Sequence, residues 1–124
     1  MSNVALLDAE LNEMIRQGKA LEAFERFYAD DVVMMENEQA FVGKDVNRKR
    51  EQEFFGNIAE VHAASIGATA VSGNVSFCEQ SFDATLADGT RVRMEEVAVR
   101  TWRDGKIVRE RFYYLPPREQ LGAR

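Results

Sequence analysis

The sequence has little of the residue types that most often mark a metal, disulfide or thiol site. It contains one cysteine, Cys78, and one histidine, His62. A single cysteine excludes an internal disulfide and a multi-cysteine zinc site, and a small buried side chain is favoured over a nucleophile at this position. One histidine excludes a histidine-rich metal site, and no HExxH spacing is present. We therefore expect no metal and no cofactor.

Long apolar runs are also missing. No apolar segment reaches the length of about 18 residues that a membrane-spanning helix needs, so we expect no membrane partner. The first residues lack a basic region followed by an apolar run, which is the pattern of a secretory signal. The cytoplasm is the expected compartment.

Positive charge is in the minority. The 16 Lys and Arg residues are outnumbered by 21 Asp and Glu residues, giving a net charge of -5. The basic clusters are interleaved with acids, so a surface for binding phosphate backbones is not indicated and no nucleic acid is expected as a partner. The length suits a single domain over residues 1–124, with an ordered core over about 3–115.

The order of periodic segments predicts an α+β fold. Helical spacing of apolar residues occurs in three segments, at Asn3–Arg16, about Lys19–Tyr28 and about Asp45–Phe55. Strand patterns occur at Val32–Met35, which ends at Glu36, and at Ala40–Val42, Glu60–Val71, Val75–Leu86, Arg91–Arg103 and Lys106–Tyr114. Turns at Gly73-Asn74, Asp88-Gly89 and Asp104-Gly105 join the last four strands into an antiparallel meander, on which the helices should pack.

The last two strands carry charged residues on an alternating face that is otherwise mostly apolar. This predicted inner face holds Val92, Met94, Glu96, Ala98, Arg100 and Trp102 and, if Trp102 pairs with Lys106, also Val108, Glu110, Phe112 and Tyr114. Pairing Thr90 with Ala87 across the preceding turn adds Phe77, Glu79, Ser81 and Asp83. Such a face suits either a ligand pocket or a buried ion-pair network, and the residues alone leave both open.

The opposite sheet face is predicted to be apolar enough to need a cover. It should carry Cys78, Phe82, Ala84, Leu86, Val97, Val99, Ile107 and Tyr113. A surface of that kind is rarely left in water, so a homodimer through this face is expected.

The sequence resembles a known superfamily along nearly its whole length. The segment FYADDVVMME after a short helix, the GKD that leads the third helix, and the ending DGTRVRMEEVAVRTWRDGKIVRERFYY are similar to the nuclear transport factor 2-like superfamily, closest to its SnoaL-like members. The resemblance implies a cone-shaped α+β barrel with three N-terminal helices on a curved, mainly antiparallel sheet. It also implies a pocket between helices and sheet and, usually, a dimer.

Within this superfamily, the shared ADD allows a comparison with ketosteroid isomerase. Glu36 falls where that family carries its carboxylate base, at the end of the first strand. The positions of the family's oxyanion-binding tyrosine and protonated acid fall near Leu11 and Ala98, which cannot act as donors. The resemblance therefore implies a pocket acid/base but does not imply a steroid isomerase.

The residues that could carry chemistry are carboxylates on the inner face. Glu36, Glu96 and Glu110 could exchange protons with a carbon or oxygen acid, and Arg100 could hold a developing enolate or an anionic group on a ligand. Arg100 could equally neutralise Glu110 or Glu96 as a structural pair, and Glu36 could be a solvated strand end. The side of the sheet on which His62 lies is not determined.

These observations combine into one functional hypothesis with one alternative. We expect the chain to bind a small apolar or carbonyl-bearing molecule and to act as a cofactor-independent isomerase, cyclase or dehydratase, with Glu36, Glu96 and Arg100 as catalytic residues. The expected ligand-binding residues are Glu110, Tyr114, Trp102, Phe112, Phe41, Phe55 and Glu79. The alternative is a non-catalytic ligand-binding or dimeric interaction module of the same fold.

Overall fold

The computed structural model describes residues 3–115, and within them the predicted order of elements is confirmed. The helices are α1 (Asn3–Arg16), α2 (Ala20–Phe27) and α3 (Lys44–Gly56), and the strands are β1 (Tyr28–Glu36), β2 (Gln39–Val42), β3 (Ile58–Ser72), β4 (Val75–Leu86), β5 (Arg91–Arg103) and β6 (Lys106–Tyr114). The positions beyond the expected core, from 116 onward, lie outside the described residues. No described helix is long and apolar enough to span a membrane.

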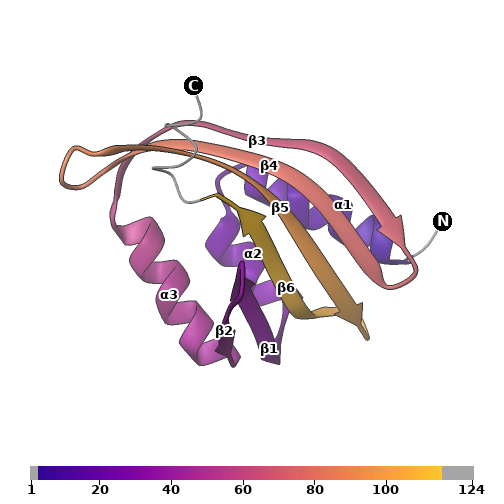
Figure 1. Ribbon diagram of the computed structural model, residues 1–124. Coiled ribbons are helices and arrows are strands. Elements are labelled where there is room, and N and C mark those ends of the chain that lie inside the picture. The colour runs from indigo at the N-terminus through magenta and orange to yellow at the C-terminus, as the bar shows by residue number, and fades with distance from the viewer. Residues whose placement is uncertain (1–2, 116–124) are drawn as a thin grey trace.

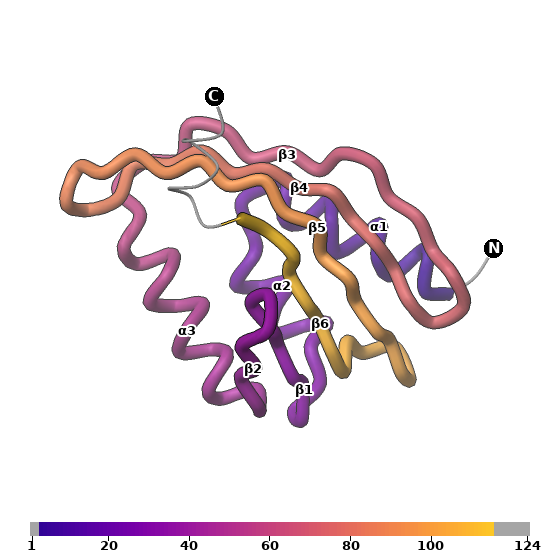
Figure 2. The backbone as a smooth tube through the Cα atoms, viewed as in Figure 1, coloured from indigo at the N-terminus to yellow at the C-terminus, as the bar shows by residue number. Residues whose placement is uncertain are grey.

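The strands form one curved, mixed sheet with the order β2-β1-β6-β5-β4-β3. All neighbouring strands are antiparallel except β1 and β6, which are parallel. The long strands β3, β4 and β5 bend over α1 and α2, while α3 lies beside β1 and β2 (Figures 1 and 2). The sheet stays open between β2 and β3, so the predicted α+β cone is confirmed as a curved layer that does not close into a barrel.

The turn between β4 and β5 differs from the prediction by one residue, and this reverses the faces of β4. Thr85 pairs with Arg91, so the loop is longer than the expected two-residue turn, and Gly89 within it adopts φ 89°. Three-residue loops commonly end on a residue in this left-handed region. Because side chains alternate along a strand, the shift turns Cys78 and Ala84 toward the helices and Phe77 away from them.

The turn between β5 and β6 is a tight two-residue hairpin followed by a bulge. Asp104 and Gly105 both have positive φ, 52° and 77°, as a type I′ turn requires. Arg103 therefore pairs with Lys106, and the expected pairing of Trp102 with Lys106 was wrong. The bulge near Thr101 restores the predicted face for the rest of β6 and sets Glu110 directly opposite Arg100.

The apolar core lies between α1, α2 and the lower half of the sheet. Its buried members are Leu11, Ala23, Phe24, Phe27, Tyr28, Val32, Met34, Trp102 and Ile107. The rings of Phe27 and Trp102 meet edge to face with centroids 6.0 Å apart. Ile107 was expected on the outer face of the sheet, but the bulge in the hairpin brings it into this core.

Directly beside this apolar core, a buried polar network joins α1 to the sheet. Arg100 donates from Nε to Glu110 at 2.8 Å and from Nη1 to Asp8 at 2.9 Å and Asn12 at 2.8 Å. Ser76 donates to Asp8 at 2.8 Å and accepts from the Trp102 indole at 2.9 Å. Arg100 and Glu110 are each 1% exposed, so the ion-pair alternative for Arg100 describes its main contacts.

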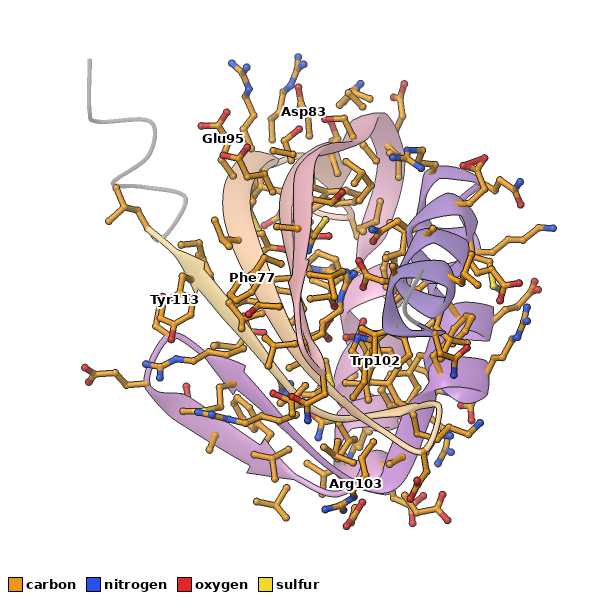
Figure 3. The ribbon with its side chains drawn as sticks, turned by 90° about the vertical axis from the view of Figure 1, so that its right-hand side faces the viewer. Phe77, Asp83, Glu95, Trp102, Arg103 and Tyr113 are labelled. Carbon is orange, nitrogen blue, oxygen red and sulfur yellow. The ribbon has the colours of Figure 1, made fainter. Side chains whose placement is uncertain are left out.

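The outer face keeps a smaller apolar set than the sequence predicted. Figure 3 shows Phe77 and Tyr113 on the side of the sheet away from the helices, and Trp102 on the helix side. Phe77, Val97 and Tyr113 are 36%, 37% and 45% exposed. The expected outer-face residues Cys78 and Ala84 are instead buried under the helices, for the register reason given above.

Removing the Arg100 guanidinium from this network should cause a large loss of stability. Replacing Arg100→Met should lower the free energy of unfolding by about 3 to 5 kcal/mol, because Glu110 and Asp8 would stay buried without their cation. The change can be measured by urea unfolding followed through the fluorescence of Trp102. The double variant Arg100→Met with Glu110→Gln should recover part of the loss.

A matched control lies on the same strand. Arg103 is exposed and 3.8 Å from the exposed Asp31, so Arg103→Met should change the free energy of unfolding by less than about 0.5 kcal/mol. Strictly additive effects of Arg100→Met and Glu110→Gln would contradict the coupling between the two side chains.

Candidate functional site

A cavity of about 570 Å³ lies between the concave face of the sheet and the helices. Most of its wall is apolar, formed by Leu11, Ile15, Phe24, Phe54, Phe55, Val61, Ile66, Phe82, Met94 and Phe112. The volume falls in the range of sites that hold small organic ligands. The helices and the curved sheet thus leave room that the core side chains do not fill.

Four carboxyl groups from four different elements meet this cavity. They are Glu36 at the end of β1, Glu51 on α3, Glu96 on β5 and Glu110 on β6. Pairing of β1 with β6 sets Glu36 beside Phe112, and pairing of β5 with β6 sets Glu96 opposite Tyr114. The sheet register therefore gathers three carboxyls at one end of the cavity, and α3 supplies the fourth.

Glu96 is a half-buried carboxyl on the predicted inner face. Its Oε1 accepts a hydrogen bond from the Gln80 amide at 2.8 Å. Burial raises the pKa of Glu96 to about 7, and the negative charges of Glu36 and Glu110 add to the rise, against the opposing effects of Gln80 and Arg100. In the observed register of β4, Gln80 pairs with Glu96 and shares its face of the sheet, whereas Glu79 points to the opposite face.

Glu51 is the carboxyl that the sequence reasoning missed. It forms no ion pair and no side-chain hydrogen bond with another residue in the described range. Burial raises its pKa to about 7, with the charges of Glu110, Glu36 and Glu96 adding to the rise and that of Arg50 opposing it. Its spacing to Phe54 and Phe55 is i, i+3 and i+4, which places all three on one face of α3 and could have identified it.

Glu36, in contrast, has partners for both of its carboxylate oxygens. Its Oε1 accepts from the Tyr114 hydroxyl at 2.8 Å, and its Oε2 lies 3.5 Å from Nη2 of Arg50. Burial, and then the bond to Glu36, raise the pKa of Tyr114 to about 12. Tyr114 does not line the cavity itself but is hydrogen-bonded to Glu36, which does. Arg50, the other partner of Glu36, stacks over the ring of Phe41 with its Cζ 3.5 Å from the centroid.

Arg100 and Glu110 form the floor of the cavity, where both are held by the buried network. Besides Arg100, Glu110 accepts from the Tyr28 hydroxyl at 2.5 Å. Burial, and then the charge of Glu110, raise the pKa of Tyr28 well above its ordinary value. Tyr28 also lines the cavity.

The remaining expected ligand-binding residues divide into two groups. Phe55 and Phe112 line the cavity. Trp102, Phe41 and Glu79 do not: Trp102 lies in the core with its indole on Ser76, Phe41 is covered by Arg50, and Glu79 is turned outward by the β4 register. His62 lies at the rim, where its Nε2 is 2.6 Å from the Thr85 hydroxyl.

Within residues 3–115, no group of three His, Cys, Asp or Glu side chains is arranged to hold a metal ion. The titratable side chains that line the cavity carry carboxyl, phenol, guanidinium and imidazole groups. Two of the carboxyls, Glu51 and Glu96, have pKa values near neutrality.

Comparison with known proteins identifies the family. The family model of the SnoaL-like domain matches residues 1–114, which is most of the chain. The chain belongs to the SnoaL-like domain family. Among curated proteins, none matches the sequence.

Solved structures similar to this SnoaL-like domain carry several functional names. A candidate SnoaL-like polyketide cyclase from Mesorhizobium loti is 34% identical, with a TM-score of 0.82 over 91% of this chain and 100% of that one. A nuclear transport factor 2-like protein of unknown function from Burkholderia pseudomallei is 18% identical, with a TM-score of 0.79 over 98% and 97%.

A third similar structure, a candidate isomerase from Bacillus subtilis, is 17% identical, with a TM-score of 0.74 over 98% of this chain and 94% of that one. At such identities the second and third structures establish the fold alone. The predicted superfamily resemblance is confirmed.

The raised pKa values of Glu51 and Glu96 predict how the stability of the SnoaL-like domain depends on pH. Their folded-state values near 7 exceed the ordinary glutamate value of 4.5, so the folded state binds more protons between these limits than the unfolded state. The stability from these groups is present below about pH 4.5 and is lost as pH rises through 7.

Replacing Glu51→Gln removes one of these titrations. The free energy of unfolding of the variant, relative to wild type, should therefore rise by on the order of 1 kcal/mol between about pH 5 and pH 8, measured by urea unfolding at each pH. Glu53→Gln, an exposed position on the same helix, should show no such drift. A difference for Glu51→Gln that stays constant with pH would contradict the placement of this carboxyl.

Proposed function

We propose that this SnoaL-like domain binds a small apolar, carbonyl-bearing molecule in the cavity and transfers a proton on it without a cofactor. The observation that carries the proposal is the presence of Glu51 and Glu96, both with pKa raised to about 7, on the wall of a mostly apolar cavity. A carboxyl whose pKa lies near the ambient pH can both accept and return a proton efficiently.

The two carboxyls have complementary roles in the proposed reaction. Near pH 7 one of them is ionised and takes the proton from the carbon next to the ligand carbonyl. The other is protonated and donates a hydrogen bond to the carbonyl oxygen, on which negative charge develops as the C–H electron pair moves into the enolate. Return of the proton to another carbon gives isomerisation. Attack of the enolate on a second carbonyl, with the proton passed to the alkoxide that forms, gives cyclisation. Transfer of the proton to a hydroxyl group on the carbon next to the enolate, which then leaves as water, gives dehydration.

Glu36 and Arg100 remain in the proposed site with narrower roles than the sequence suggested. Glu36 is held by Tyr114 and Arg50, and its negative charge helps to keep the pKa of Glu51 and Glu96 high. Arg100 contributes a fixed positive charge at the cavity floor, but its Nε and Nη1 are engaged by the buried network. Phe55 and Phe112 would contact the apolar part of the ligand.

The alternative is a non-catalytic ligand-binding module, and one observation favours it. The positive charge of Arg100 is shared by Asp8 and Glu110, so the ligand finds no arginine at the floor that is free to hold an enolate. The name of the 34% identical structure, a candidate polyketide cyclase, supports the enzyme.

The proposed assembly is a homodimer through the outer sheet face. Phe77, Val97 and Tyr113 form an apolar patch there, each more than a third exposed in the single chain. Burying such side chains contributes about 25 cal/mol per Å² before the costs of association. A second copy of the same face would cover this patch around a two-fold axis.

The catalytic proposal can be tested with 2-tetralone, a bicyclic ketone with acidic protons next to its carbonyl. Wild-type protein should accelerate exchange of these protons for deuterium in D₂O, followed by proton NMR. Glu51→Gln and Glu96→Gln should each lower the acceleration by about 100-fold, because each removes one half of the acid/base pair.

Glu53→Gln serves as the control for this exchange, since it removes a carboxylate from α3 outside the cavity. It should exchange at the wild-type rate. Binding of the ketone without any acceleration over buffer would reject the enzyme and support the non-catalytic module.

The dimer proposal has a separate test. Val97→Glu should give monomers or insoluble protein, because a carboxylate would be buried at the centre of the interface. Light scattering measures the outcome. A monomeric wild-type protein at micromolar concentration would show that the outer face is not an interface between copies.

A further inference from the structure

Each arginine on the cavity wall already has a carboxylate partner. The pairs are Arg16 with Glu13 at 3.2 Å, Arg50 with Glu36 at 3.5 Å, and Arg100 with Asp8 at 2.9 Å and with Glu110 at 2.8 Å. Since Arg100 is shared by two carboxylates, the floor of the cavity carries an excess of negative charge even before Glu51 and Glu96 are considered.

Glu51 and Glu96 are the wall carboxyls that have no cationic partner in the described part of the chain. The titratable groups that surround them are Arg16 from α1, Arg50 from α3, Tyr28 and Glu36 from β1, His62 from β3, Arg100 from β5, and Glu110 and Tyr114 from β6. His62 is exposed at the rim beside Glu60, 3.6 Å away. None of these cations is both close to the two carboxyls and free.

We infer that the cavity selects an apolar molecule that carries a protonated amine, which is held between Glu51 and Glu96, and that it rejects carboxylates and phosphates. The inference rests on the cavity of the proposed function as the ligand site and concerns binding rather than proton transfer, because a carboxylate paired with a ligand ammonium is not free to move a proton of the ligand. The apolar part of such a ligand would lie against Phe54, Phe55 and Phe82.

The two carboxyls lie in a partly dehydrated space where the described residues supply no free cation to compensate their charge. A carboxylate removed from water is stabilised by a cation at hydrogen-bond distance, and the ammonium of a ligand supplies one that the protein lacks. An anionic ligand would instead face four carboxyl groups with every nearby arginine already engaged. Shape does not provide this discrimination, because an ammonium, an alcohol and a carboxylate on the same ring system are of similar size.

The titration of the two carboxyls supports the same conclusion. Burial and the surrounding negative charges raise the pKa of both to about 7, so each is largely protonated below that pH. A bound cation favours the ionised form and lowers the pKa of the carboxyl beside it. Binding of an amine near pH 7 should therefore release protons, and its affinity should rise as the pH increases from about 6 to 8.

The test uses three probes that share a naphthalene ring and carry a cationic, a neutral or an anionic group: naphthylmethylammonium, naphthylmethanol and naphthoate. Titration calorimetry at about pH 8 should give an affinity about tenfold higher for the ammonium than for the alcohol, and the weakest binding for naphthoate. Repeating the ammonium titration near pH 7 in buffers of different ionisation enthalpy should reveal proton release, which the alcohol should not cause.

Two variants locate the effect. Glu51→Gln and Glu96→Gln should each remove most of the preference for the ammonium while keeping the affinity for the alcohol, which also reports that the cavity is intact. Glu53→Gln removes the same charge from α3 outside the cavity and should keep the preference.

Failure of the amine selectivity and failure of the proposed function would give different results. Equal binding of the three probes, or tighter binding of naphthoate, would overturn the amine selectivity and leave the proposed proton transfer standing. Absence of binding by all three would overturn the cavity as a small-molecule site, and with it both the amine selectivity and the proposed function.

Discussion

The buried ion pair between Arg100 and Glu110 is the interaction on which the rest of the structure depends. Arg100 ties β5 to β6 through Glu110 and to α1 through Asp8 and Asn12, and Glu110 in turn holds the Tyr28 hydroxyl at the start of β1. Separating α1 from β5 and β6 would leave a buried charge without its partner, at a cost of several kcal/mol, so these three elements are held in a fixed arrangement. This arrangement fixes the distance between α1 and the curved sheet, and the cavity lies in the space between them.

The same ion pair determines the electrostatics of the cavity. The guanidinium of Arg100 is bound by both Asp8 and Glu110, so it does not form an ion pair with Glu51 or Glu96. Burial raises the pKa of both carboxyls, and the negative charges of Glu110 and Glu36 add to the rise. Groups that would be costly in a purely structural role are thereby available for proton transfer or for binding a charged ligand.

The sequence predicted the element order and the inner face of β5, because both follow from local periodicity and from turn residues such as Asp104 and Gly105. It placed β4 on the wrong face, since one extra loop residue before Thr90 reverses every side chain and leaves no trace in the alternation itself. Glu51 was missed for a different reason. It lies in a helix rich in charged residues, where a carboxylate is expected to be exposed to water, and its burial depends on packing that the sequence of the helix does not show. The superfamily resemblance directed attention to Glu36, which the structure supplies with partners on both oxygens.

The most direct test of this account is an NMR titration of the glutamate side-chain carboxyls, with Glu51→Gln and Glu96→Gln used to assign the two resonances. Both carboxyls should titrate near pH 7 in the folded protein. Titration of both near the ordinary value of 4.5 would contradict it, because the cavity would then hold two fully ionised, water-exposed carboxylates with no reason to exchange protons with a ligand.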